Sequence, residues 1–172
     1  LGEFYRERDL FQKGEPLVLR ALALQKKATG EADSTYVMLQ NNLALLYLGQ
    51  AAYGKAEALL LQAASTHLQL PSTNKEEYAR CLLSLGALYS ETGMYTEAEK
   101  YFLEAIQLRK SVLGERHSDY AGALNQLAEL YRKQSVYAKA EPLYLEAIAI
   151  RKAAAGESDP DYATCLNNLA LL

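Results

Sequence analysis

The chain has 172 residues, of which 50% are hydrophobic and 23% charged, and its formal net charge at pH 7 is −3. This balance is typical of a soluble globular protein and excludes a disordered chain. No apolar run approaches the roughly 18 residues of a membrane span, and the charged stretch from Glu3 to Asp9 is unlike a secretory signal. The mild acidity argues against nucleic acid as the main partner, because nucleic-acid binders carry a dense basic patch.

Aromatic and small residues recur along the chain with a fixed period of 42 residues, as from residue 5 to residue 47. Three aromatic columns share this spacing: Tyr5, Tyr47, Tyr89 and Tyr131; Tyr36, Tyr78, Tyr120 and Tyr162; Phe11, Tyr53, Tyr95 and Tyr137. Two columns of small residues share it as well: Gly14, Ala56, Ala98 and Ala140; Ala21, Ala63, Ala105 and Ala147. Small residues mark close approaches of helix backbones, so each period is one packing unit of a repeat protein.

Within one period, the apolar spacing predicts two helices and no strand. Helix A covers about residues 35–49, since Leu43, Ala44 and Tyr47 recur at helical spacing and Gly49 follows. Helix B follows from Tyr53 to about residue 69, and its equivalents lie at roughly 11–28, 95–112 and 137–154.

Turn signals separate one period from the next. Gly30, Gly114 and Gly156 stand where a helix end needs a left-handed residue. Asp159-Pro160-Asp161 has the order of an N-cap, a first-turn proline and an acid at the positive helix end. The loop at 70–76 lacks the Gly-Glu pair of the others, which indicates either a contact point or the drift that surface loops tolerate.

These patterns predict a single all-α repeat domain over residues 1–172. Its parts are a partial helix A plus helix B at 1–34, full repeats at 35–76, 77–118 and 119–160, and a partial helix A at 161–172. Because both ends stop inside a helix, we expect a segment of a longer repeat array. Its open ends are then covered by end-to-end self-association or else fray.

Several segments resemble the tetratricopeptide repeat, in which a small residue follows Leu and a Tyr follows three residues later. The 42-residue period is similar to the kinesin-light-chain type of this repeat, which also occurs in large bacterial proteins. The segments that carry this likeness are 140–144, 150–152, 156–157 and 166–170. The resemblance implies a right-handed α-solenoid of antiparallel helix pairs, whose A helices line a concave groove that holds peptides or partner domains. The chain does not match the basic and Asn positions of the protein-chaperone clamp, since Met38, Gly122 and Thr164 occupy one of its columns.

Candidate catalytic and metal-binding groups are scattered. His67 and His117 lie far apart without a second ligand at metal spacing. Cys81 and Cys165 share one column and are expected to be free, buried thiols, which favours a reducing, cytoplasmic location. The glutamates at 57, 99 and 141 repeat as surface or capping groups do. We therefore expect no enzyme activity, no metal and no cofactor.

Candidate binding residues lie on helix A, on the face opposite the core stripe. They are Asn41, Asn42, Arg80, Asn125, Gln126, Arg132, Asn167 and Asn168. Carboxamides carry both donors and an acceptor, so they suit the backbone of an extended peptide. Each Asn could equally be solvated or link one helix to the next. Because Glu91 and Glu129 dilute the basic residues, an acidic ligand is only modestly favoured.

Two arginine-lysine pairs, 109–110 and 151–152, end the B helices, where cations complement the helix dipole. We expect these pairs to be structural.

The sequence thus favours a protein interaction scaffold that binds an extended peptide or partner domain in the A-helix groove. The alternative is a structural spacer or self-association array next to a catalytic or signalling domain outside this segment. In both cases the expected partner is a protein, with neither nucleic acid nor membrane.

Overall fold

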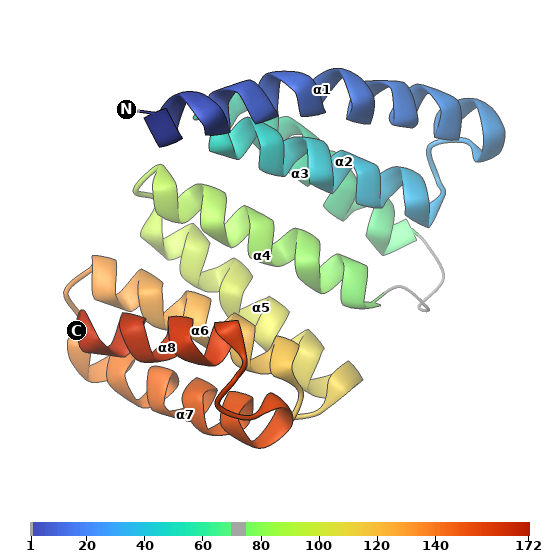
Figure 1. Cartoon of the computed structure of the whole chain (residues 1–172). Helices are drawn as coiled ribbons and strands as arrows, with labels where there is room; N and C mark the ends of the chain where they lie inside the picture. The colour runs from blue at the N-terminus through green and yellow to red at the C-terminus, as the bar shows by residue number, and fades with distance from the viewer. Residues whose placement is uncertain (1, 70–74) are drawn as a thin grey trace. The chain divides into compact units, whose positions relative to one another are not determined.

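The computed structural model describes residues 2–69 and 75–172, and the side chains from residue 13 onward (Figure 1). In these ranges the regular structure is entirely helical and comprises α1 (Gly2–Thr29), α2 (Ser34–Gly49), α3 (Tyr53–Gln69), α4 (Lys75–Glu91), α5 (Tyr95–Leu113), α6 (Ser118–Lys133), α7 (Tyr137–Ala155) and α8 (Pro160–Ala170). The all-α prediction is confirmed. The predicted bounds of α2, α3, α5 and α7 lie within two residues of the observed ones. Of the helices described, none is both long and apolar enough to cross a membrane. Of the loop at 70–76 that was singled out in the sequence, residues 70–74 lie outside the described residues, and residues 75 and 76 belong to α4.

The helices group into two compact units, Leu1–Leu88 and Tyr89–Leu172. In the first unit α2 packs against both α1 and α3. Its start is fixed by Asp33, whose carboxylate accepts hydrogen bonds from the backbone N–H groups of Thr35 and Tyr36 at 2.9 and 3.2 Å. Ala56 and Ala63, from the small-residue columns, are fully buried, as close helix packing requires.

In the second unit consecutive helices pack in the same order, α5 on α6, α6 on α7 and α7 on α8. One core cluster joins three of these helices and consists of Tyr120, Ala121, Leu124, Ala147 and Cys165. Gly114 ends α5 with φ 86° and ψ 163°, a backbone conformation that is essentially restricted to glycine. The predicted turn glycines are therefore confirmed at this position, and Gly30 and Gly156 also have positive φ.

The first 29 residues differ from the prediction. We expected the end of a helix A, a turn and then a helix B, but residues Gly2–Thr29 form one uninterrupted helix. In later repeats the turn between helices A and B contains a residue with positive φ, at Ala51, Gly93 and Ser135. Asp9 occupies this column in the first repeat. The helix continues through this position without a turn.

Candidate functional site

The predicted binding residues of the second unit lie on α6 and α8. Gln126 and Asn167 are exposed, whereas Asn125 and Asn168 are half-buried. The side-chain amide of Asn168 donates a hydrogen bond to Oδ1 of Asn125 at 3.2 Å. This pair therefore links one A helix to the next, which was one of the alternatives to peptide binding for these asparagines. Of the predicted binding carboxamides in this unit, Gln126 and Asn167 are therefore the exposed ones.

Arg132 does not stand free on this face. Its guanidinium forms two hydrogen bonds to the carboxylate of Glu129, at 2.8 and 2.6 Å. Glu129 also accepts a hydrogen bond from the hydroxyl of Tyr144, at 2.9 Å, and Tyr144 is completely buried. Arg132 and the Tyr144 hydroxyl hold the pKa of Glu129 below its usual value, against the opposing effect of burial. Leu45 and Ala87 replace Glu129 in the two preceding full repeats, so among the full repeats the sequence allows this cluster only in 119–160.

A second cation on this face is also paired. Lys133 at the end of α6 lies 2.7 Å from the carboxylate of Glu91 at the end of α4. Glu91 and Glu129, which the sequence suggested would dilute the basic charge, thus each neutralise one cation directly. Little net charge is left on this face to attract a charged ligand.

The predicted residues of the first unit are Asn41, Asn42 and Arg80. Asn41 is only 4% exposed, and its Oδ1 is buried without a hydrogen-bond partner. The expectation that Asn41 lies on the open face is therefore wrong. The reason is that α2 is covered by α1 as well as by α3, so more of its circumference is buried than one apolar stripe predicts. Asn42 is half-buried, and Arg80 is exposed and bonded to Glu77 at 2.9 Å.

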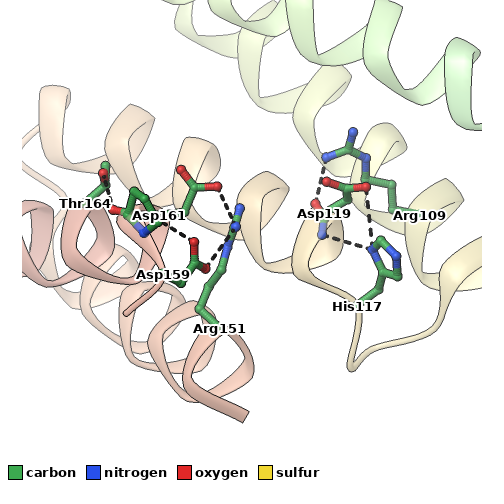
Figure 2. A network of polar contacts seen from close by, with 8 residues as sticks. Arg109, His117, Asp119, Arg151, Asp159, Asp161 and Thr164 are labelled. Atoms are coloured by element: carbon green, nitrogen blue, oxygen red, sulfur yellow. Dashed lines mark hydrogen bonds and ion pairs between the residues drawn. The ribbon is translucent and has the colours of Figure 1, made fainter. Parts of the chain in front are cut away.

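Two arginines join the end of a B helix to the start of the next A helix (Figure 2). Arg109, which is 7% exposed, donates to the backbone carbonyl of Asp119 at 2.7 Å. Arg151 reaches the carboxylate of Asp161 at 2.5 Å and that of Asp159 at 3.5 Å. A structural role was predicted for both arginines from the helix dipole. Their main contacts, however, are to the next helix and its N-cap, which the helix-dipole argument did not predict.

Exposed ion pairs recur beside these connections. Lys26 pairs with Glu31, Lys110 with Glu115, and Lys152 with Glu157 at 2.6 Å. All six side chains are well exposed, so these pairs contribute little to stability.

In the column of repeated glutamates, Glu141 is exposed, as predicted, but Glu99 and Glu15 bind tyrosine hydroxyls. Oε1 of Glu99 accepts a hydrogen bond from the hydroxyl of Tyr131 at 2.5 Å, and Glu15 accepts one from Tyr47 at 2.9 Å. Burial and the Glu99 carboxylate raise the pKa of Tyr131 to about 12. In both pairs the residues are 32 apart, so the coincidence of a Glu column with a Tyr column was the sequence signal that could have found them.

Among the residues described, no group of three or more His, Cys, Asp or Glu side chains could hold a metal ion. Cys81 and Cys165 are buried, free thiols. Burial raises the pKa of the Cys81 thiol to about 12, and also raises that of Cys165, so neither is a thiolate at neutral pH.

The family model for the tetratricopeptide repeat matches residues 35–111, 77–153 and 119–172. The chain therefore belongs to the tetratricopeptide repeat family, and its helix pairs are those of a tetratricopeptide repeat solenoid. No curated protein sequence matches it closely enough to be a relative.

Solved structures with the same fold are of the kinesin-light-chain type. BtubC (BKLC) from P. vanneervenii has a TM-score of 0.79 at 21% identity, over 94% of this chain and 65% of that chain. A Podosopora anserina protein, described as a kinesin light chain with nearly identical TPR-like repeats, has a TM-score of 0.71 at 19% identity. The match covers 98% of this chain and 82% of that one. The chain thus spans just under two thirds of the length of the BtubC chain.

Proposed function

We propose that this chain is a protein interaction module that binds an extended segment of a partner along the exposed face of its A helices. The family generally mediates contacts between proteins. The observation that carries the proposal here is the exposure of Gln126 on α6 and Asn167 on α8, on helices already joined by the Asn125–Asn168 hydrogen bond. Exposed carboxamides held on two connected helices can donate to and accept from a peptide backbone without reading its side chains.

The charge of the partner follows from the ion pairs on the same face. Each predicted basic residue is bonded to an acid nearby, Arg80 to Glu77 and Arg132 to Glu129. We therefore expect a weak preference for acidic over neutral segments and a shallow dependence of affinity on salt concentration. The free thiols support a reducing compartment such as the cytoplasm for this interaction.

The test begins with a display library of extended peptides selected on the chain, followed by calorimetry with the selected peptides. Gln126→Ala and Asn167→Ala should each weaken binding about fivefold for one lost hydrogen bond of about 1 kcal/mol. Gln107→Ala, at an exposed position of α5, is the matched control and should leave affinity unchanged. If the library yields no binder, or if both variants bind as the wild type does, the segment is better described as a structural spacer.

A further inference from the structure

Each B helix keeps a leucine exposed at the same place in the repeat. The column consists of Leu19, Leu61, Leu103 and Leu145, which are 42–50% exposed. Four residues further along each helix, another exposed position changes between repeats and holds Ser65, Gln107 or Ala149. A leucine that recurs beside a variable position, with nearly half of its surface in solvent, favours a contact with another molecule.

The leucines of α5 and α7 lie on neighbouring helices of the second unit. Lys139 on α7 reaches the carboxylate of Glu99 on α5 at 3.7 Å, so the two helices lie side by side. Glu146 follows Lys139 by seven residues, which is two turns along the same side of α7, so it also faces α5. The exposed Glu146 therefore lies between Leu103 and Leu145 at the surface.

The charges beside the two leucines are predominantly negative. Glu104 and Glu146 directly follow the leucines, Glu141 precedes Leu145 by one helical turn, and all three glutamates are exposed. The hydrogen bond to Glu146 comes from the uncharged hydroxyl of Tyr120 at 3.4 Å, so the carboxylate keeps its negative charge. Three of the four lysines of α5 and α7 are paired with other carboxylates: Lys110 with Glu115, Lys139 with Glu99 and Lys152 with Glu157. This surface is therefore complementary to a basic one.

The acidic residues distinguish the second unit from the first. The residue that follows Leu61 is Gln62, and the one that follows Leu19 is Arg20. An exposed leucine is thus common to all B helices, whereas an exposed leucine followed by a carboxylate occurs on α5 and α7.

We propose that the outer face of α5 and α7, defined by Leu103, Glu104, Leu145 and Glu146, binds a basic amphipathic helix of a partner protein. The apolar stripe of the partner helix covers the two leucines, and lysine or arginine at the edges of that stripe pairs with the two glutamates. The site lies on B helices, so it is separate from the proposed A-helix site and does not depend on it.

A helix suits this surface better than an extended segment does. The backbone groups of α5 and α7 are hydrogen-bonded within the helices, so the surface offers side chains and no strand edge for pairing. A helix presents apolar residues at i, i+4 and i+7 as one stripe with charged residues on both sides. This is the complement of exposed leucines that have carboxylates beside them.

The first test is selection on the chain from two display libraries of amphipathic helices. The libraries share the same apolar stripe and differ only at its edges, which carry lysine and arginine in one and aspartate and glutamate in the other. We expect binders from the basic library and none from the acidic one, and selected basic helices are then measured by fluorescence anisotropy. The absence of basic binders, or equal recovery from both libraries, would overturn the proposal.

Substitutions then place the selected helices on the surface. Leu145→Lys should weaken binding at least ~100-fold, because it brings an ammonium group against the apolar stripe of a basic helix. Leu61→Lys in α3 is the matched control and should bind as the wild type does, since Gln62 replaces the adjacent carboxylate there. Equal binding by Leu145→Lys and the wild type, or an equal loss in Leu61→Lys, would contradict the assigned site.

Glu146→Gln tests the electrostatic part of the contact. Glutamine keeps an acceptor for the Tyr120 hydroxyl and removes the charge, so affinity should fall about fivefold at low salt and depend less steeply on salt concentration. An unchanged salt dependence would refute the pairing of Glu146 with the partner. Gln126→Ala on the A-helix face should leave the affinity unchanged, which separates this site from the proposed groove. Circular dichroism should show wild-type helicity for all four variants, since each replaces an exposed side chain.

Discussion

Ala147→Leu tests whether the small-residue columns are places where helices meet. Ala147 is completely buried and lies in the core cluster with Tyr120, Ala121, Leu124 and Cys165. A leucine in an open site would gain at most about 2 kcal/mol from the added buried surface. At a position with no exposed surface, the extra carbons must displace neighbours from α6 and α8. We therefore expect the substitution to lower the free energy of unfolding by roughly 1–3 kcal/mol.

The assay is thermal unfolding followed by circular dichroism. For a domain the size of the second unit, each kcal/mol corresponds to roughly 4–8 °C, so the melting temperature should fall by about 4–24 °C. Ala149→Leu provides the matched control, because Ala149 lies two residues further along the same helix and is exposed. Its melting temperature should stay within about 2 °C of the wild type. Equal melting of Ala147→Leu and the wild type would refute the assigned packing of α7.

Three further substitutions test other parts of the structure. Arg132 keeps the pKa of Glu129 low in the folded state, so ionised Glu129 stabilises the fold above its unfolded pKa of about 4.3. This stabilisation is lost as the pH falls through the folded-state pKa. The melting temperature of Glu129→Gln should therefore fall less between pH 5 and 3 than that of the wild type. Gly114→Ala should reduce stability by about 1–3 kcal/mol in denaturant titrations, because a side chain is strained at φ 86° even though nothing lies within 4 Å of the added carbon. Burial lowers the pKa of His67, so the free energy of unfolding should begin to fall as the pH drops below the unfolded-state pKa of about 6.5. His67→Gln introduces the residue type found at Gln25, one period earlier. This variant should not show the loss of stability in thermal melts between pH 7 and 5.

Periodicity predicted the helices well because each repeat buries the same columns. The small residues at 56, 98, 105 and 140 are core residues, and the predicted turn glycines have the positive φ that their place requires. The course of α1 was not predictable from the columns alone. The column of the turn between helices A and B contains residues as different as Ala51, Gly93 and Ser135, so the residue type at Asp9 does not tell whether a turn forms there.

The binding face was only partly predictable for a related reason. A helical stripe identifies the side that faces one neighbour, but α2 has two neighbours, and this places Asn41 in the interior. The Arg132–Glu129 pair could have been read from its i, i+3 spacing. The hydrogen bond from Asn168 to Asn125 could not, because it depends on how closely α6 and α8 approach each other.

Side-chain amide NMR of the chain with a display-selected peptide tests the central claim most directly. On saturation with the peptide, we predict that the carboxamide resonances of Gln126 and Asn167 shift, while that of Gln107 on α5 does not. If the peptide binds and the carboxamide resonances of Gln126 and Asn167 stay unchanged, binding along the A helices is contradicted.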